Sequence, residues 1–528
     1  MLRQVLTESG MVQGLVGHDA RISVFRGVPY AKPPVGELRW RAPQPCEKWT
    51  GIRECYDYGP MAMMRVKPGS GTDFYTKELH PVASGYEMSE DCLYLNIFTP
   101  AETGAEKLPV LCYIHGGGLQ DGYSYEIEFD GERLARRGIV VVMIGYRLGL
   151  FGFLAHPDLT AETPAGQPIS NFGIQDQSMA LHWVNRNIAA FGGDPDRITI
   201  CGQSAGASSV LAQICTPANR GLIKGAICQS GGSLAYGEED SDRRFPALKD
   251  AEQYGKEFME DIGLYSIEEA RKVDAYELMR RLTHATPKET GLFAIHFGMV
   301  LDGVFLKEST SASFYNRRTP DIPLMIGHCQ DETKMALFGW REPPSLAEFR
   351  EMAAVYGDRA EAFLQAAGAQ SDEDVARLYE RGDFDAFRAG CRGMCELRAE
   401  NGQKTYHFVF DHDIPGGDGA GSFHGSDLWF MFDSLANSWR PFVGKHYDLA
   451  RQVCSYWINF VKTGDPNGTD YFGNPLPEWR PFRKEDRAYI RFKDVPEPEV
   501  MREDPVIDFR LAYARERFAD QPAEKENA

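Results

Sequence analysis

The chain has 528 residues, of which 43% are hydrophobic and 25% are charged, a composition typical of globular proteins. Its formal net charge at pH 7 is −19, which disfavours nucleic acids and anionic membranes as partners. No run approaches the roughly 20 apolar residues that a membrane-spanning helix needs.

The N-terminal segment and the cysteines bear on the cellular location. Residues 1–15 lack the apolar core and the cleavage site of a secretory signal peptide. The eleven cysteines are odd in number, and several, such as Cys112 and Cys201, lie in apolar runs typical of buried free thiols. Cys391 and Cys395 are four residues apart, but no group of His or Cys residues completes a zinc set. We therefore expect a reduced, cytoplasmic protein without a metal site.

Six strongly apolar segments predict buried strands. They are residues 108–114, 139–146, 198–201, 225–230, 322–329 and 405–411. Apolar residues follow one another there instead of alternating with polar ones, which indicates strands covered on both faces. Residues 174–193, between the second and third of these segments, have a helical periodicity that ends at Gly192. The order strand, helix, strand predicts an α/β fold with a mostly parallel sheet flanked by helices.

We expect one large domain, formed by residues 1–515. Residues 238–385 are rich in charged helical patterns and predict a helical cap region inserted into the sheet domain. Residues 516–528 have few apolar side chains to bury, so we expect a flexible C-terminal tail there.

A single G-x-S-x-G pattern is centred on Ser204, in the stretch CGQSAGASS. It follows a predicted strand and precedes a run of small residues that predicts a helix. A serine on such a tight turn needs glycines on both sides, because larger side chains would collide there. The helix behind it would offer free N–H groups and the positive end of its dipole. The pattern indicates a nucleophilic serine, although a glycine-rich turn with a buried serine would have the same five residues.

A second glycine-rich stretch, HGGG at residues 115–118, follows the first predicted strand. Acyl transfer passes through an oxyanion, and main-chain N–H groups stabilise it when they can approach closely. Glycines permit that approach, so HGGG upstream of G-x-S-x-G is a combination typical of α/β-hydrolases, whereas alone it would indicate only a flexible turn. We expect His115 itself to be structural.

A nucleophilic serine requires a base, and the base requires an orienting acid. In α/β-hydrolases the acid and then the histidine follow the serine in the chain. The histidines that satisfy this order are His284, His296, His328, His407, His412, His424 and His446. His424 lies in a glycine-rich loop after a strand, where α/β sites are built, which favours it modestly over His412. Asp331 and Glu332 both follow the strand at 322–329, and the residues alone do not choose between them.

Longer stretches identify a family. They are FRGVPYAKPPVGELRW, SEDCLYLNIFTP, HGGG, YRLGLFGFL, NFGIQDQSMALHWVNRNIAAFGGDPDRITICGQSAGA, QSGG, GHCQDE, FHGSDLWFMF and FVKTGDPN. In these stretches, which run in family order over nearly the whole chain, the sequence resembles the type-B carboxylesterases, the family of the bacterial para-nitrobenzyl esterases and the cholinesterases. The resemblance implies an α/β-hydrolase fold and a serine carboxylesterase that acts on a small-molecule ester without a metal or organic cofactor.

The resemblance also implies roles for single residues. It makes Ser204 the nucleophile, Glu332 the acid and His424 the base. It makes the N–H groups of Gly117, Gly118 and Ala205 the oxyanion donors. It further implies two buried ion pairs that hold the site, Arg39 with Glu90 and Arg147 with Asp176, although four surface charges would look the same in the sequence.

The chain departs from the family pattern at a few positions. Leu119 stands where an aromatic residue usually follows the glycines, Thr333 where a glycine usually follows the acid, and Gly145 where asparagine is common. Cys92 has no upstream cysteine of the kind that pairs with it in secreted relatives, so we expect a free thiol. The shape of the pocket around Leu119 and residues 61–86, the natural ester and the oligomeric state remain open.

Two other functions fit parts of this pattern. Some relatives serve in adhesion and have lost the serine, so a non-catalytic binding protein is one alternative, although the serine, acid and histidine are all present here. A lipase or an amidase is the other. A lipase usually has a strongly apolar mobile lid, whereas residues 66–92 mix polar and aromatic side chains.

A histidine base predicts a pH-dependent activity. Histidine changes its charge near neutrality, and a protonated His424 has no lone pair to accept the proton of Ser204. We expect kcat/KM for para-nitrophenyl acetate to fall below neutral pH. A flat profile from pH 5 to 9 would count against a histidine base.

Overall fold

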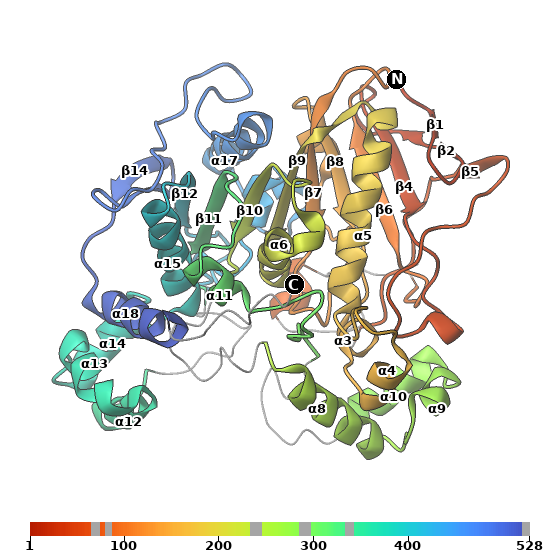
Figure 1. Cartoon of the computed structure of the whole chain (residues 1–528). Helices are drawn as coiled ribbons and strands as arrows, with labels where there is room; N and C mark the ends of the chain where they lie inside the picture. The colour runs from red at the N-terminus through yellow and green to blue at the C-terminus, as the bar shows by residue number, and fades with distance from the viewer. Residues whose placement is uncertain (65–73, 80–86, 233–244, 285–296, 333–342, 520–528) are drawn as a thin grey trace.

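The computed structural model describes residues 1–64, 74–79, 87–232, 245–284, 297–332 and 343–519, which are organised around one large sheet (Figure 1). Eleven described strands pair in the order β14-β13-β12-β11-β10-β9-β7-β8-β6-β4-β3. They are β3 (Leu15–Val16), β4 (Ser23–Pro29), β6 (Tyr94–Thr99), β7 (Leu108–Ile114), β8 (Val140–Ile144), β9 (Gly193–Gln203), β10 (Gly225–Gln229), β11 (Leu324–Cys329), β12 (Thr405–Phe410), β13 (Ala488–Phe492) and β14 (Pro496–Val500). A separate small sheet joins β1 (Gln4–Leu6), β2 (Met11–Gln13) and β5 (Ile52–Glu54).

The six strands predicted from the sequence form the centre of the large sheet. In the order β8, β7, β9, β10, β11 and β12, each pairs in parallel with its neighbour. Antiparallel pairing occurs toward the edges, where β6 pairs with β8 and β4, β3 with β4, and β14 with β13. The predicted α/β class with a mostly parallel sheet is therefore confirmed.

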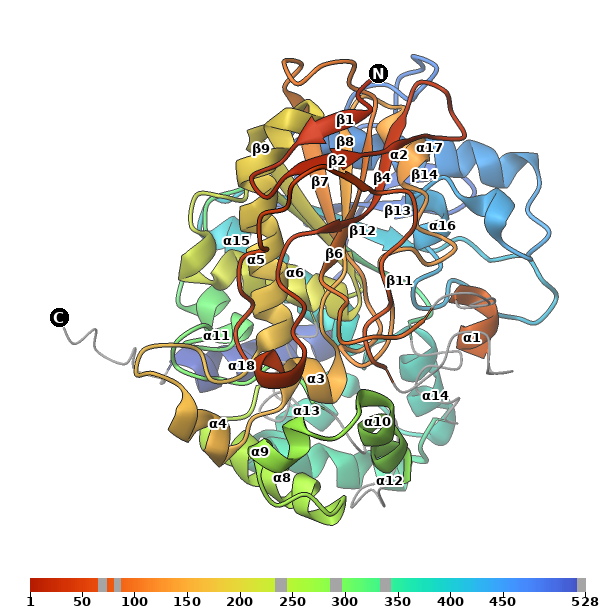
Figure 2. The same ribbon diagram turned by 90° about the vertical axis from the view of Figure 1, so that its right-hand side faces the viewer.

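Helices cover both faces of the sheet, as the two views at right angles show (Figures 1 and 2). One face carries α5 (Phe172–Asn187), α6 (Ala205–Cys215), α11 (Thr310–Tyr315), α15 (Ala386–Glu400) and α18 (Pro505–Ala519). The other carries α2 (Gly131–Ala135), α16 (Leu428–Met431) and α17 (Gly444–Thr463). This layering explains why the central strands are apolar at every position.

Strand β7 illustrates how one strand serves two cores. Val110, Cys112 and Ile114 belong to the core that also contains side chains of α5 and α6. Leu111 and Tyr113 point the other way, into the core that contains side chains of α17. All five residues are at most 1% exposed. Neighbouring residues of a strand face opposite sides of the sheet, so a strand between two helical layers must be apolar throughout.

Helical segments extend beyond one end of the sheet (Figure 1). Those before β11 are α8 (Leu248–Asp261), α9 (Ile267–Arg271) and α10 (Ala275–His284), and those after it are α12 (Leu346–Met352), α13 (Ala360–Ala367) and α14 (Asp372–Glu380). Strand β11 of the central sheet thus divides the predicted cap region of residues 238–385. We infer one domain with two helical insertions. Helix α18 continues to Ala519, past the predicted boundary at residue 515, and residues 520–528 lie outside the described part of the chain.

Shorter helices complete the described chain. They are α1 (Phe74–Leu79), α3 (Gly149–Phe153) and α4 (Pro157–Glu162), with the 3-10 turns η1 (Gly36–Leu38), η2 (Ile188–Phe191), η3 (Pro217–Asn219), η4 (Ala353–Arg359) and η5 (Leu435–Asn437). Helix α5 passes into η2 and stops at Gly192, which adopts a φ of 82°. The predicted end of this helix at Gly192 therefore has a conformational reason.

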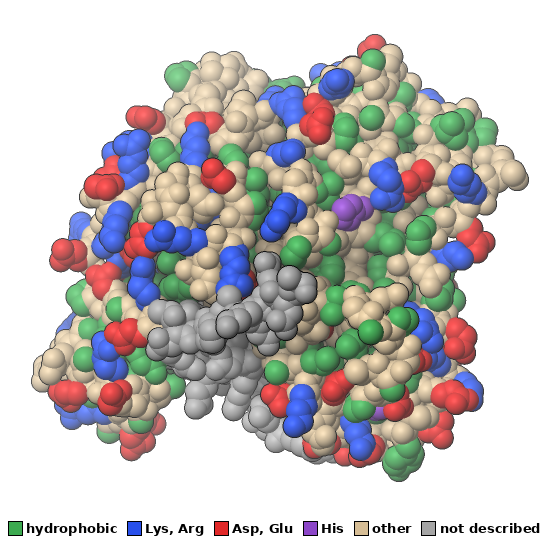
Figure 3. Space-filling model, in the orientation of Figure 1, with side chains coloured by type: hydrophobic (Ala, Val, Ile, Leu, Met, Phe, Trp, Pro, Cys, Tyr) green, Lys and Arg blue, Asp and Glu red, His purple; other side chains and the backbone are tan. Residues whose placement is uncertain are grey.

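The surface carries charges of both signs. In the face shown in Figure 3, lysine and arginine side chains are interspersed with aspartate and glutamate over most of the drawn surface. Within the described ranges, no helix is long and apolar enough to cross a membrane. The negative net charge is thus distributed over a solvated surface and not gathered on this face.

Candidate active site

The predicted catalytic residues all follow parallel strands of the central sheet. Ser204 follows β9, the HGGG stretch follows β7, Glu332 lies three residues after β11, and His424 lies in the loop after β12. Because these strands are parallel, their carboxyl ends lie at the same edge of the sheet. Ile114 at the end of β7 pairs with Gly202 of β9, which places HGGG directly beside Ser204.

Ser204 occupies a strained turn between β9 and α6. Its φ of 57° and ψ of −126° lie outside the regions that non-glycine residues normally adopt. Such a conformation costs about 1–3 kcal/mol and persists only where the surroundings enforce it. The main-chain N–H of Ser204 donates to the carbonyl of Gln229 (2.9 Å), and its carbonyl accepts from the N–H of Ser208 (3.0 Å). The serine is thus fixed by β10 on one side and by its own helix on the other.

The positions on both sides of Ser204 require glycine, because a Cβ there would clash with main-chain carbonyl oxygens. A Cβ on Gly206 would lie 2.1 Å from the carbonyl oxygen of Ile114 and 2.7 Å from that of His115. A Cβ on Gly202 would lie 2.4 Å from the carbonyl oxygen of Gly206. Helix α6 therefore packs against the end of β7 at a distance that only glycine allows, as the sequence pattern predicts.

The HGGG loop lies against the serine. A Cβ on Gly116 would come within 3.1 Å of the Ser204 Cβ. Gly117 and Gly118 have φ values of 94° and 64°. No described residue accepts a hydrogen bond from the N–H of Gly117 or Gly118, and Ala205 is the first residue of α6, where the N–H has no partner within the helix. The N–H groups predicted as oxyanion donors thus belong to two neighbouring segments, the glycine loop after β7 and the first turn of α6.

The remainder of this loop is held rigidly. The carbonyl of Gly117 accepts from the N–H groups of Gln120 (3.0 Å) and Asp121 (2.9 Å). The Tyr146 hydroxyl donates to the His115 carbonyl (2.9 Å), and the two rings stack with centroids 4.4 Å apart. His115 thus lies in the support of the loop.

The structure separates the two acidic candidates that the sequence left open. A Glu332 carboxylate oxygen contacts His424 Nδ1, and its other oxygen accepts from the N–H of Cys329 (2.7 Å). Asp331 instead accepts from the N–H and the hydroxyl of Ser422, at 3.0 and 3.3 Å. Burial acts to raise the pKa of Glu332, but the charge and hydrogen bond of His424 lower it below its ordinary value. Glu332 is therefore present as a carboxylate.

The other histidines that the chain order allowed face their own surroundings. Among the ring nitrogens, Nδ1 of His328 lies 2.8 Å from the Cys329 carbonyl, Nδ1 of His407 lies 3.0 Å from that of Ile326, Nδ1 of His412 lies 3.3 Å from Asp494, and Nδ1 of His446 lies 3.0 Å from the Val443 carbonyl. The side chain of His284 and the whole of His296 lie outside what the structure describes. Only His424 among the described candidates contacts Glu332.

Ser204 and His424 do not form a hydrogen bond with each other in the described residues. Instead, Nε2 of His424 lies 3.1 Å from Nε2 of Gln203, the residue before the serine. The ring of Phe387 lies on another side of His424, with centroids 5.2 Å apart. The sequence analysis missed Gln203, because it occupies an unspecified position of the G-x-S-x-G pattern.

Two buried carboxyl groups near the Glu332–His424 pair were also missed. Burial raises the pKa of Asp385 to about 7, and the nearby Glu332 charge adds to this effect. Burial likewise raises the pKa of Asp427 to about 6, although a hydrogen bond from Gln229 (2.7 Å) lowers it. Asp385 caps α15 by accepting from the N–H groups of Phe387 and Arg388. Three buried carboxyl groups thus lie near one histidine, and burial favours the protonated form of two of them, Asp385 and Asp427.

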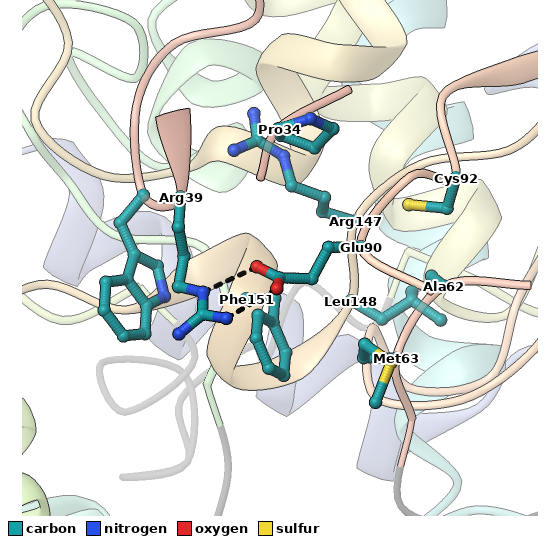
Figure 4. A pocket seen from close by; sticks show the side chains of 10 residues that line it. Pro34, Arg39, Ala62, Met63, Glu90, Cys92, Arg147, Leu148 and Phe151 are labelled. Atoms are coloured by element: carbon teal, nitrogen blue, oxygen red, sulfur yellow. Dashed lines mark hydrogen bonds and ion pairs between the residues drawn. The ribbon is translucent and has the colours of Figure 1, made fainter. Parts of the chain in front are cut away.

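The first of the two predicted ion pairs, Arg39 with Glu90, lines a small pocket (Figure 4). Arg39 Nε and Nη2 each lie 2.6 Å from a carboxylate oxygen of Glu90. Arg39 Nη1 also donates to the carbonyls of Ala270 (2.8 Å) and Val273 (2.7 Å). Arg39 therefore links the segment before β6, which contains Glu90, to the end of α9.

The second pair is more deeply buried. Arg147 donates from Nε and Nη2 to Asp176, at 2.8 and 2.7 Å, and its main-chain N–H also donates to Asp176 (3.1 Å). Arg147 is 2% and Asp176 0% exposed. Burial acts to lower the pKa of Arg147, but Asp176 raises it above its ordinary value. The pair fixes α5 to the segment that follows β8.

The departures from the family pattern have different outcomes. Leu119 is 6% exposed and has a φ of 61°. A Cβ on Gly145 would lie 3.1 Å from the Cys92 carbonyl, so the chain leaves little room for a larger residue there. Cys92 is a free thiol. Thr333 and most of the segment 65–86 lie outside the described residues.

Comparisons with known proteins place this geometry in a wider context. A family model described as "Carboxylesterase family" matches residues 2–506. The chain is 34% identical over 485 residues to phenmedipham hydrolase of Pseudarthrobacter oxydans, which covers 88% of this chain and 90% of that protein. It is 33% identical over 478 residues to fumonisin B1 esterase of Sphingopyxis macrogoltabida, which covers 87% and 82%. A solved PNB esterase superposes with a TM-score of 0.80 at 27% identity, over 97% of this chain and 99% of that one. The resemblance found in the sequence is confirmed.

The raised pKa of Asp385 predicts a pH-dependent stability. The folded protein retains this proton up to about pH 7, whereas an unfolded chain releases it near pH 4. The stability that Asp385 contributes is therefore complete below pH 4 and is lost as the pH rises through 7. Asp385→Asn resembles the protonated form and does not titrate, so we expect its melting temperature relative to that of the parent to be higher at pH 8 than at pH 5.

The exposed Asp196 provides the control for this comparison. Asp196→Asn should follow the parent at both pH values. If Asp385→Asn and the parent differed by the same amount at pH 5 and 8 in calorimetry, Asp385 would not titrate in this range.

Proposed function

The chain belongs to the carboxylesterase family and is a serine hydrolase of carboxylic esters, and we propose that Ser204, His424 and Glu332 are its nucleophile, base and acid. The observation that carries this assignment is their convergence. The strained serine, the glycine loop and the His424–Glu332 pair come from four parallel strands and lie at one edge of the sheet. We also propose the N–H groups of Gly117, Gly118 and Ala205 as the oxyanion donors.

The proposed reaction follows the chemistry of a serine, histidine and acid triad. His424 Nε2 takes the proton of the Ser204 hydroxyl while Oγ bonds to the ester carbonyl carbon. The oxyanion that forms is stabilised by the three N–H groups, and by the positive end of the α6 dipole. His424 then protonates the leaving alcohol, and water releases the acyl group by the reverse sequence.

Glu332 supports this cycle through Nδ1. Its carboxylate keeps the Nδ1 proton in place and stabilises the imidazolium that forms at each proton transfer. The hydrogen bond from the Cys329 N–H fixes the other carboxylate oxygen. Glu332 is fully buried, so water does not compete for this contact.

We propose a small-molecule ester as the substrate. Its acyl and alcohol parts can be identified by experiment. Two relatives act on fumonisin B1 and phenmedipham according to their names, and neither compound is assigned to this chain. A panel of esters varied separately in the acyl and alcohol parts, run on the parent and on Ser204→Ala, would define the preference. We also propose a cytoplasmic location, which the eleven free cysteines support.

The nucleophile assignment predicts a contrast between two serines of the same turn and helix. Ser204→Ala should lower kcat for para-nitrophenyl acetate by about 10⁴-fold or more, because the proposed attacking hydroxyl is lost. Ser208→Ala, four residues along α6, should retain activity within about threefold and react with a fluorophosphonate probe. Labelling of Ser204→Ala at the parent rate would refute the assignment.

The acid assignment predicts a similar contrast between neighbours. Glu332→Gln should lower kcat by about 10²-fold or more, because the amide no longer holds the Nδ1 proton by charge. Asp331→Asn preserves the shape of the Ser422 contacts and should retain most of the activity. If Asp331→Asn were the more damaging of the two in steady-state kinetics, the acid would have been assigned to the wrong residue.

A further inference from the structure

The Gln203 side chain forms a hydrogen bond with Nε2 of His424, the nitrogen that must accept the serine proton in the proposed reaction. Gln203 is the last residue of β9 and is 2% exposed. Its Nε2 lies 3.1 Å from His424 Nε2. Its Oε1 lies on the side of the HGGG loop, since a Cβ added to Gly116 would lie 3.1 Å from this oxygen. The amide therefore fills the space between the base and the glycine loop.

Glu332 determines the direction of this hydrogen bond. Because the carboxylate accepts at Nδ1, that nitrogen carries the single proton of the neutral imidazole, and Nε2 presents its lone pair. The Gln203 amide N–H is then the donor and His424 Nε2 the acceptor. Nε2 has one lone pair, so the amide and the Ser204 hydroxyl compete for the same acceptor.

We propose that Gln203 is a positioning residue that holds His424 neutral and protonated at Nδ1 between turnovers, and that Ser204 replaces its amide at Nε2 when an ester binds. This inference rests on the proposed function, because it takes His424 as the acceptor of the serine proton. The exchange breaks one hydrogen bond and forms another. The hydroxyl proton then moves to Nε2 as Oγ bonds to the carbonyl carbon, and the amide keeps its own protons.

The groups around His424 explain why such a donor matters. Among the described residues, the titratable groups that interact with the His424–Glu332 pair include the carboxyl groups of Asp385 and Asp427, the imidazole of His328 and the thiols of Cys329 and Cys391, and Arg388 acts on His328. The carboxyl groups of Glu332, Asp385 and Asp427 favour a protonated imidazole whenever they are ionised. The amide N–H of Gln203 acts in the opposite sense, because it can donate to Nε2 only while that nitrogen is unprotonated. The Gln203 amide thus opposes the protonation of Nε2 that the carboxylates favour.

The test compares two substitutions of Gln203 with a matched control. Gln203→Met keeps the length of the side chain without the donor, and Gln203→Glu keeps the shape with a negative charge. Gln213→Met removes a glutamine of α6 that is also buried but contacts Ile174, Gln177 and Asn219. The measurements are kcat/KM for para-nitrophenyl acetate from pH 5 to 9, and ¹⁵N NMR titration of His424 in the Ser204→Ala background.

In Gln203→Met we expect the acidic limb, the fall of kcat/KM on the low-pH side of the profile, to move to higher pH. The shift should be about 0.5–1 pH unit, the effect of one lost hydrogen bond. The activity of this variant at pH 9 should stay within about threefold of the parent, because the donor is not needed once the imidazole is neutral. Gln203→Glu should move the limb further and lower activity at pH 7 by about tenfold, with recovery toward pH 9. Gln213→Met should keep the parent limb.

Equal limbs and equal NMR midpoints in Gln203→Met and the parent would overturn the proposal, as would a uniform loss of activity at every pH. The NMR titration does not require turnover, so it reports on the Gln203–His424 contact whatever the base is. The signal of His424 is identified by its absence in His424→Ala. If His424→Ala remained active, the proposed function would fail while the contact could still be measured.

Discussion

The close packing of α6 against the end of β7 is the constraint on which the site depends. It requires glycine at position 206, because any side chain there would clash with the carbonyl oxygens of Ile114 and His115. Ser204 lies two residues before Gly206 in its strained conformation, and the glycine loop approaches its Cβ. The proposed nucleophile, the glycine loop with its proposed oxyanion donors and the N-terminus of α6 thus lie together around one backbone contact.

The centre of the fold could be predicted from the sequence, and its edges could not. Six apolar runs correspond to the six consecutive parallel strands from β8 to β12, because burial on both faces leaves a strong local signal. The outer strand β3 has only two residues and β14 is largely half-buried or exposed, so their patterns resemble those of loops. The predicted cap region included β11, because a range drawn from charged helices ignores one strand between them.

The site was predictable where a short motif determines the backbone. Ser204 and its glycines were found in this way, since the turn itself requires them. The choice between Asp331 and Glu332 depends on which side chain faces the loop after β12, and no local pattern contains that contact. Gln203, Asp385 and Asp427 escaped for the same reason, because their importance comes from neighbours distant in the sequence.

The contacts of Arg39 limit how the helical insertion that contains α9 can vary among related enzymes. Its guanidinium satisfies Glu90 and also the carbonyls of Ala270 and Val273 at the end of α9. The insertion that contains α9 is therefore not an independent module that can be exchanged freely between relatives. A transplanted segment must end its helix at the same place, or it leaves a buried cation with unfilled hydrogen bonds. Variation in this wall of the enzyme is thus limited by an arginine that lies more than 200 positions earlier in the chain, since the Arg39 contacts span 231 and 234 residues.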